Sequence, residues 1–508
     1  MTHPRPRWTR IAAASTGLAL TAALGFLPGS ASADTARDAA VAAADAKAAG
    51  DTLPYLVNAD TDRGTTARVT KAISAADGKL VKAYERIGVF IVHSANADFA
   101  EQLRKVRGVD SAGAARTAPL KPAWTHEDKE GAPKPYSVKD APKAAADQEP
   151  LEPEQWDLRA IKSDKANKIN PGSKKVTVGV IDTGVDDTHP DLAPNFSKSQ
   201  SANCVGGVAD TSDGAWRPYT EDAYHGTHVA GEVAAARNGV GVAGVAPGVK
   251  VASIKVSEPD TQLFFPESVV CAFVFAADHG IEITNNSYYV DPWLYNCKDD
   301  PDQRAIVDAV GRASAYAQKK GLLNIASAGN SNHDLDADSI VDDSSPDDTT
   351  PVERTIDPSE CFDVPTQLPG VVTVSATGVQ DLKSEYSTYG KGWVDVAAPG
   401  GDKFQVPDTP SKNGRILSTM PGNKYAFLAG TSMASPHVAG VAALLKSEYP
   451  YAKGPLLQAL LKAQADNPGC PDFYDPDGNG VEDSKCEGSK KSNGFYGRGI
   501  VDALDAVR

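Results

Sequence analysis

The chain has 508 residues, of which 41% are hydrophobic, so it can bury a large core and still carry accessory segments. Its formal net charge at pH 7 is -15, with 66 acidic against 51 basic residues. Because an acidic surface repels polyanions, we expect neither nucleic acid nor an anionic membrane as a partner.

Residues 1–33 have the pattern of an export signal. Arginines precede an apolar stretch at 11–27, and small residues at 31–33 supply a cleavage site. A Pro-Gly pair at 28–29 favours a cleaved signal over a membrane anchor, and no later segment is long and apolar enough to span a bilayer. We therefore expect a secreted, extracellular product.

Residues 34–118 predict a separate, small α+β unit. Strands are expected at 55–57 and 88–92, and apolar residues at helical spacing predict helices at 69–76 and 99–106. The next stretch, 119–150, is rich in Pro, Ala, Lys and Asp, which predicts a solvated linker that a protease can cut. Residues 151–508 then form the main domain.

A β-branched, apolar run at 175–181 predicts a buried strand that leads directly into Asp182. Open α/β sheets place their sites at this end of their strands. Residues 222–231 begin a helix of small residues that can pack closely on the sheet, so His225 at its start is expected to face the same crevice. A lone Asp or His would more often be structural.

A second helix is expected to begin at Ser432. A hydroxyl there lies beside the positive end of the helix dipole, where a developing oxyanion is stabilised. Gly430 leaves room for substrate backbone, and we expect Pro436 in the first turn, where its missing N–H costs nothing. The alternative is a capped helix start in which Ser432 only satisfies backbone donors.

Together these segments resemble the subtilase family of serine endopeptidases. The matching stretches are 180–184, 225–231 and 430–440, in the chain order Asp, His, Ser. The resemblance covers about residues 150 to 508. It implies a subtilisin-like three-layer α/β fold with a mostly parallel sheet, preceded at 34–118 by an inhibitory prodomain. A generic accessory domain is the alternative for that segment.

The resemblance also implies a role for each residue. Ser432 would attack the scissile carbonyl, His225 would take and return the proton, and Asp182 would hold the imidazole in the correct tautomer. Asn330, which follows a predicted strand, matches the family's oxyanion-hole asparagine. His228 is assigned to structure, because only the first histidine of its motif acts as the base in the family.

The substrate-binding candidates are Ser287, Tyr288, Tyr289 and Gly329. In the family, small residues usually follow the serine of this strand, so the two tyrosines here would narrow the pocket or hinder pairing with substrate backbone. After Asn330 comes an acidic insertion. Its charge would select basic substrates or hold an ion. The alternative, which we prefer, is a solvated loop, because runs of charge are usually solvated. Its acidic residues are Asp334, Asp336, Asp338, Asp342, Asp343, Asp347 and Asp348.

The chemistry needs no cofactor, but calcium is expected as a possible structural ion. Asp191 and Asn238 match a family segment that often binds calcium through oxygen ligands of mixed type. Arg237, next to Asn238, would supply positive charge in place of the ion. A plain surface turn without calcium is therefore the alternative. Residues 475–480 resemble the start of an EF-hand loop, but a proline breaks the pattern and favours an acidic turn.

The six cysteines are an even set in a chain expected to be secreted, so disulfides are the default. Connectivity does not follow from sequence alone. Cys470 and Cys486 flank one loop and are the safest pair, while elimination favours Cys204–Cys271 and Cys297–Cys361. None of them has metal-ligand spacing, which argues against zinc.

The sequence thus predicts a secreted serine endopeptidase, made as a self-processed zymogen. Its partners would be protein or peptide substrates and its own prodomain as a transient inhibitor, and we expect a monomer. One alternative is a processing peptidase restricted to one partner protein, and another is a non-catalytic binding protein on this scaffold. A nucleotide-binding domain is disfavoured, because no Gly-rich loop follows the strand at 175–181.

Overall fold

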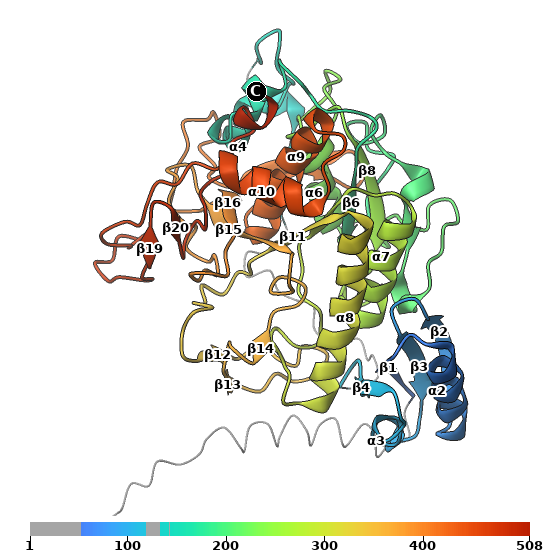
Figure 1. Ribbon diagram of the computed structural model, residues 1–508. Coiled ribbons are helices and arrows are strands. Elements are labelled where there is room, and N and C mark those ends of the chain that lie inside the picture. Colours follow the sequence, from blue (N-terminus) through green and yellow to red (C-terminus); the bar gives the residue numbers. More distant parts are fainter. Residues whose placement is uncertain (1–51, 118–132, 142) are drawn as a thin grey trace, which may run out of the picture.

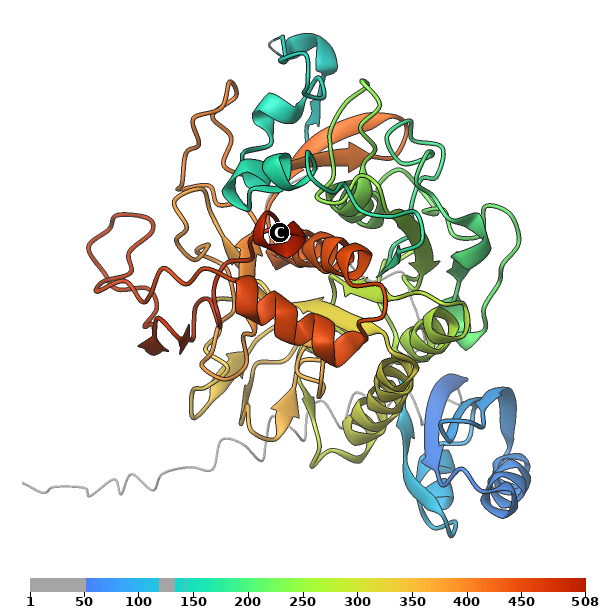
Figure 2. The same cartoon turned by 45° about the horizontal axis from the view of Figure 1, so that its top comes forward.

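The computed structural model describes residues 52–117, 133–141 and 143–508. The export signal expected at 1–33 and the first part of the linker lie outside these residues. The described chain forms a small N-terminal unit, blue in Figure 1, beside a large α/β unit. Both views place the small unit against the helices α7 (Pro266–Asp278) and α8 (Pro301–Lys320) (Figures 1 and 2).

The small unit is an antiparallel sheet in the order β2-β3-β1-β4 with two helices packed on it. The expected strands and helices of this unit are present, and two further strands, β2 and β4, complete the sheet. Apolar residues of all its longer elements form a core of its own. In chain order the elements are β1 (Leu53–Ala59), α2 (Arg63–Ala75), β2 (Gly78–Tyr84), β3 (Val89–Ser94), α3 (Phe99–Arg104) and β4 (Val109–Ala114).

The large unit is built on a seven-stranded parallel sheet in the order β16-β15-β11-β9-β6-β8-β7. Its strands are almost wholly buried, as expected for a sheet covered on both faces. The strands are β6 (Thr177–Asp182), β7 (Ala202–Asn203), β8 (Lys250–Lys255), β9 (Ile283–Asn286), β11 (Leu323–Ser327), β15 (Val372–Thr377) and β16 (Val396–Pro399).

Helices cover both faces of this sheet (Figures 1 and 2). On one face α6 (His225–Ala234), α9 (Thr431–Glu448) and α10 (Gly454–Gln464) share a core with the strands, and on the other α7 and α8 do. The three-layer α/β fold expected from the sequence is confirmed.

The remaining elements are short and lie around this framework. One of them, β5, comes from the expected linker and pairs with β18, so this part of the linker packs against the large unit. The bounds are β5 (Pro135–Tyr136), α4 (Trp156–Ala160), α5 (Ser163–Ala166), β10 (Asn296–Cys297), β12 (Ile340–Asp342), β13 (Arg354–Ile356), β14 (Cys361–Phe362), β17 (Ile416–Met420), β18 (Lys424–Leu428), β19 (Gly488–Ser489) and β20 (Ser492–Asn493).

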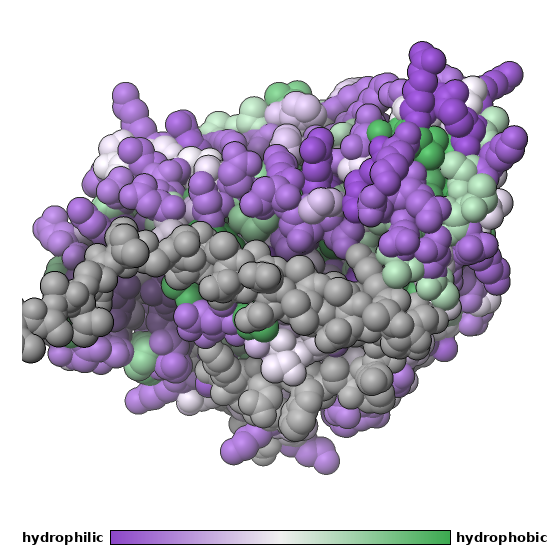
Figure 3. Space-filling model, turned by 90° about the horizontal axis from the view of Figure 1, so that it is seen from below, coloured by the Kyte–Doolittle hydropathy of each residue, from purple (hydrophilic) through white to green (hydrophobic). Residues whose placement is uncertain are grey.

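Disulfides join the three pairs that the sequence favoured: Cys204–Cys271, Cys297–Cys361 and Cys470–Cys486. Among the described residues, no helix combines the length and apolarity that a membrane crossing requires. Seen from below, the described surface is mostly hydrophilic with scattered apolar residues (Figure 3), in keeping with the acidic composition.

Candidate active site

Asp182 and His225 meet at the carboxyl edge of the central sheet. Asp182 ends β6 and is fully buried, and both of its carboxylate oxygens lie 2.9 Å from His225 Nδ1. His225 is the first residue of α6, and its side chain remains 22% exposed. A buried carboxylate against Nδ1 leaves Nε2, the other ring nitrogen, at the accessible end of the imidazole.

Close packing of α6 on β6 makes this contact possible. A Cβ on Gly226 would lie 2.4 Å from the backbone oxygen of Gly184 and 3.0 Å from the Cβ of Asp182, so only glycine fits. The Thr183 hydroxyl accepts from the Gly226 N–H at 2.9 Å and fixes the start of the helix. The small residues expected in this helix therefore allow α6 to approach β6 closely.

Ser432 lies at the start of α9, as expected, but Pro436 does not lie in the first turn. Because α9 begins at Thr431, Pro436 falls in the second turn and removes the helical bond to the Ser432 carbonyl. Ser287, which follows β9, replaces that donor: its hydroxyl donates to Ser432 O at 2.9 Å. The Ser432 hydroxyl itself contacts Ser287 O at 3.3 Å.

Asn330 is held at the same helix start. Its Oδ1 accepts from both the N–H and the hydroxyl of Thr431, each at 2.8 Å. Its Nδ2 lies beside Gly430, where no side chain intervenes. Gly329, at φ +101°, donates its N–H to the Thr431 hydroxyl at 3.1 Å. Sequence reasoning missed Thr431, although it stands next to the motif serine, because its role depends on the distant Asn330.

The two tyrosines after Ser287 pack inward. Tyr288 is buried, and its ring stacks on Phe264 with centroids 4.9 Å apart. Its hydroxyl donates to Asn286 Oδ1. The Tyr289 hydroxyl donates to Asp347 at 2.8 Å. The expectation that the Tyr288 ring would narrow the substrate pocket is therefore not supported by its placement.

The acidic insertion is only in part the solvated loop that we favoured. Asp336, Asp338 and Asp343 are exposed. Asp342, however, is fully buried in β12, and Arg354 of β13 binds it through two guanidinium nitrogens at 2.7 and 2.9 Å. Burial raises the pKa of Asp347 to about 7. An internal counter-charge and hydrogen bonds thus fold part of this segment against the domain.

The calcium candidates lie on two neighbouring loops, where Asn238 Nδ2 donates to Pro190 O at 3.0 Å, but they differ in how well they suit an ion. Asp191 is fully buried, Oδ2 accepts from Val242 N–H and the Tyr425 hydroxyl, and Oδ1 has no hydrogen-bond partner among the described residues. Burial also raises the pKa of Asp191. An unpartnered buried carboxylate oxygen suits a cation.

Asn238 suits the ion less well, because its Oδ1 already accepts from Val240 N–H at 3.1 Å. Arg237, the alternative source of charge, pairs instead with Glu152 at 2.7 and 2.8 Å.

Neither His228 nor the acidic loop at 475–480 belongs to the candidate active site. His228 is fully buried between Glu232 and the Ala426 carbonyl, and burial lowers its pKa to about 3, so it is neutral and part of the core. In the loop expected to be an acidic turn, Asp475, Asp477 and Asp483 lie close together near the surface. The Asp475 carboxylate accepts several N–H groups of its own turn.

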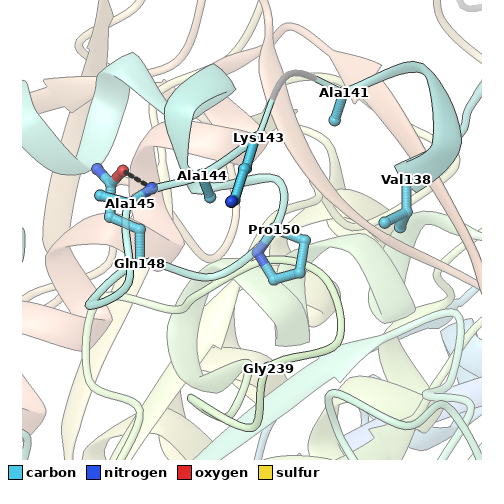
Figure 4. A pocket seen from close by; sticks show the side chains of 8 residues that line it. All are labelled: Val138, Ala141, Lys143, Ala144, Ala145, Gln148, Pro150 and Gly239. Carbon is cyan, nitrogen blue, oxygen red and sulfur yellow. Dashed lines mark hydrogen bonds between the residues drawn. The ribbon is translucent and has the colours of Figure 1, made fainter.

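A pocket of about 360 Å³ lies elsewhere, over the Gly239 loop (Figure 4). Its other lining residues are Val138, Ala141, Lys143, Ala144, Ala145, Gln148 and Pro150. The Gln148 side chain accepts from Ala145 N–H at 3.2 Å. None of its lining residues belongs to the candidate site.

Comparisons with known proteins identify the family of this chain. The profile described as Subtilase family matches residues 173–499. A thermophilic serine proteinase of Bacillus sp. (strain AK1) is 33% identical over 287 residues, which cover 56% of this chain and 56% of that protein. Subtilisin BL of Lederbergia lenta is 29% identical over 319 residues, covering 63% of this chain and 94% of that protein.

Solved structures match the architecture as well. The epidermin leader peptide processing serine protease of Staphylococcus aureus superposes with a TM-score of 0.63 over 90% of this chain and 98% of that one. At 24% identity this likeness concerns the fold alone.

Taken together, fold and matched segments define the class as serine endopeptidases of the α/β type. The chain belongs to the subtilase family, since the family match covers well over half of it. It spans just over half the length of the thermophilic proteinase and nearly all of subtilisin BL.

Proposed function

We propose that this chain is a secreted serine endopeptidase that cuts peptide bonds in proteins and is made as a self-processed zymogen. The observation that supports it most is the buried Asp182 carboxylate, 2.9 Å from His225 Nδ1, at the same sheet edge as Ser432. That arrangement orients a base at the edge of the sheet where Ser287, directly after β9, contacts the Ser432 hydroxyl.

In the proposed mechanism, Ser432 Oγ attacks the scissile carbonyl carbon while His225 Nε2 accepts its proton. Asp182 keeps the Nδ1–H tautomer and stabilises the imidazolium that forms. His225 then delivers the proton to the leaving amine, and the acyl-enzyme on Ser432 is hydrolysed by water activated by the same imidazole.

Asn330 is proposed as the side-chain donor to the oxyanion. Thr431 occupies its Oδ1 through two bonds, which directs Nδ2 toward the start of α9. The positive end of the dipole of that helix would add to the stabilisation of negative charge. Ser287 and Gly329 beside them are the proposed substrate-binding backbone, supported by the buried Tyr288 and the partly buried Tyr289.

Residues 34–118 are proposed as the inhibitory prodomain, and the structure describes residues 52–117 of them. They pack on α7 and α8, where Arg312 of α8 donates to Ala59 O at 2.7 Å, and the Tyr84 hydroxyl donates to Gly207 O at 2.8 Å. Apolar side chains of the small unit, Val89 and Ile91 among them, also share a core with α7 and α8, so the contact is both polar and apolar.

Calcium is proposed as a structural ion at Asp191, whose buried Oδ1 lacks another partner among the described residues. It would supply no catalytic step. Calcium is expected to raise the melting temperature of the Ser432→Ala protein, and Asp191→Asn in that background is expected to abolish the shift. An equal shift in both proteins would contradict the site.

Intact-mass and gel analysis of wild type beside Ser432→Ala, with casein as reporter, tests the main proposal. Wild type is expected to lose residues up to the 119–150 linker and to cut casein, whereas the variant keeps its full mass after signal removal and cuts nothing. Self-processing without casein cleavage would favour the processing peptidase restricted to one partner. Identical behaviour of the two proteins would contradict the assignment.

A further inference from the structure

Arg116, near the end of the described N-terminal unit, fills an acidic pocket of the large unit. Its guanidinium Nη2 lies 2.8 Å from Glu267 Oε1 and also pairs with Glu258. Its Cζ lies 3.8 Å from the ring centroid of Phe265. The side chains of Arg116, Glu258 and Glu267 are 10%, 12% and 2% exposed, so the ion pairs are almost closed to water.

The pocket belongs to the large unit and is left without its counter-charge when the N-terminal unit departs. Glu258 follows β8, Phe265 caps α7, and Glu267 lies in the first turn of that helix. Burial raises the pKa of Glu258, and the nearby Glu267 charge adds to the effect. Removing one partner of a buried ion pair is costly, so two neighbouring carboxylates here favour another cation.

Two connections place this pocket beside the candidate active site. The first runs along β8, which pairs with β6 up to Asp182. Directly after β8, the N–H of Val256 donates to the backbone oxygen of Asp182 at 3.0 Å. Glu258 follows two residues later, so it extends from the same edge of the sheet.

The second connection runs through aromatic packing. Phe264, the neighbour of Phe265, stacks on Tyr288, and Tyr288 follows Ser287, whose hydroxyl bonds to the Ser432 carbonyl. Contacts from residue to residue therefore link one wall of the pocket to the start of α9.

The tail that carries Arg116 is held on this wall by a further contact. The N–H of Thr117 donates to Asp348 at 2.8 Å, and the Thr117 hydroxyl bonds to the same carboxylate. Asp348 adjoins Asp347, the partner of Tyr289. The tail is thus bound through both its backbone and its arginine side chain, as a peptide substrate would be.

We propose that Glu258, Glu267 and Phe265 form a specificity subsite for an arginine side chain on the acyl side of the scissile bond. This inference rests on the proposed function, because self-processing in the linker cuts on the carboxyl side of Thr117 and leaves Arg116 on the acyl side. Arginine is preferred over lysine, since a planar guanidinium can lie against the Phe265 ring while one of its nitrogens, Nη2, pairs with both carboxylates.

The test uses mature enzyme obtained from the full chain and a series of fluorogenic peptides. Arginine, lysine or alanine occupies each of the successive acyl-side positions in turn, and casein serves as the general substrate. At one position, arginine is expected to raise kcat/KM at least about tenfold over alanine, the factor of one charge-assisted hydrogen bond. Glu258→Gln/Glu267→Gln is expected to remove this preference while casein hydrolysis continues.

Two variants guard against a folding defect. Glu282→Gln is the matched control: this partly buried glutamate accepts from Thr177 N–H at the opposite end of β6 and should leave the preference intact. Phe265→Leu keeps both carboxylates and is expected to lower the arginine-to-lysine ratio. Wild type that cuts casein without any arginine preference overturns this inference alone. Wild type that cuts neither casein nor any peptide overturns the proposed function.

Discussion

The hydrogen bond between Ser287 and the Ser432 carbonyl offers a direct test of how the nucleophile is held. Pro436 cannot donate to that carbonyl, so Ser287 Oγ, 145 positions away in sequence, is its donor at 2.9 Å. The same hydroxyl lies 2.8 Å from Ser435 Oγ and accepts from Asn285 Nδ2 at 2.9 Å. Ser287→Ala therefore leaves several buried polar atoms without a partner.

The expected loss of unfolding free energy is about 1–3 kcal/mol, the cost of unsatisfied buried polar groups. Pro436→Ala supplies a new N–H in position for the helical bond to the Ser432 carbonyl. The gain in unfolding free energy from Pro436→Ala should therefore be about 1 kcal/mol larger in the Ser287→Ala background than in the parent. This difference is the coupling energy of the double-mutant cycle.

Thermal and urea unfolding measure this cycle, with all variants made in the Ser432→Ala background to prevent self-digestion. Ser375→Ala is the matched control, since it removes a buried hydroxyl that donates to Phe495 O at 2.6 Å, far along the chain from the nucleophile. Pro436→Ala should not restore the unfolding free energy that Ser375→Ala loses. A coupling energy near zero between Ser287 and Pro436 would refute the reasoning.

Three further outcomes are expected. Asn330→Ala should lower kcat by about 10²–10³ with little change in KM in steady-state peptide kinetics, and a loss confined to KM would contradict its oxyanion role. Asp182→Asn should lower kcat by about 10⁴, because an amide favours the wrong tautomer of His225; near-normal kcat would remove Asp182 from the mechanism. The pKa of Asp347 rises from 3.8 to about 7 on burial, so folding loses stability as pH rises between these values. Asp347→Asn should thus raise the melting temperature of the Ser432→Ala protein at pH 8 but not at pH 3, and equal shifts at both pH values would contradict the buried acid.

Sequence reasoning located the parts of the site that depend on local patterns. A buried strand ending in Asp182 and a glycine-rich helix start at His225 are short-range signals, because strand burial and close helix packing constrain residues next to each other. The strand and the two helices that carry Asp182, His225 and Ser432 begin close to where they were expected.

Long-range contacts were beyond the same reasoning. The position of Pro436 was wrong by one helical turn, because its tolerance depends on Ser287 in another element. Charge alone suggested a solvated loop around Asp342, but Arg354 in the paired strand compensates its burial. The strand β2 was missed, since its two lysines and partial exposure weaken the apolar pattern.

The Arg116 pocket shows the same limit. Glu258 and Glu267 are unremarkable in sequence, and only the fold brings them together around an arginine more than a hundred residues earlier in the chain.

The central claim is that Ser432 is a nucleophile activated by His225 and Asp182. The most direct measurement is intact-mass and peptide-mapping analysis after treatment of the mature enzyme with a fluorophosphonate that labels activated serines. A single adduct on Ser432, strongly reduced in His225→Ala, is the predicted result. No adduct, an adduct on another serine, or equal labelling of the His225 variant would contradict the account.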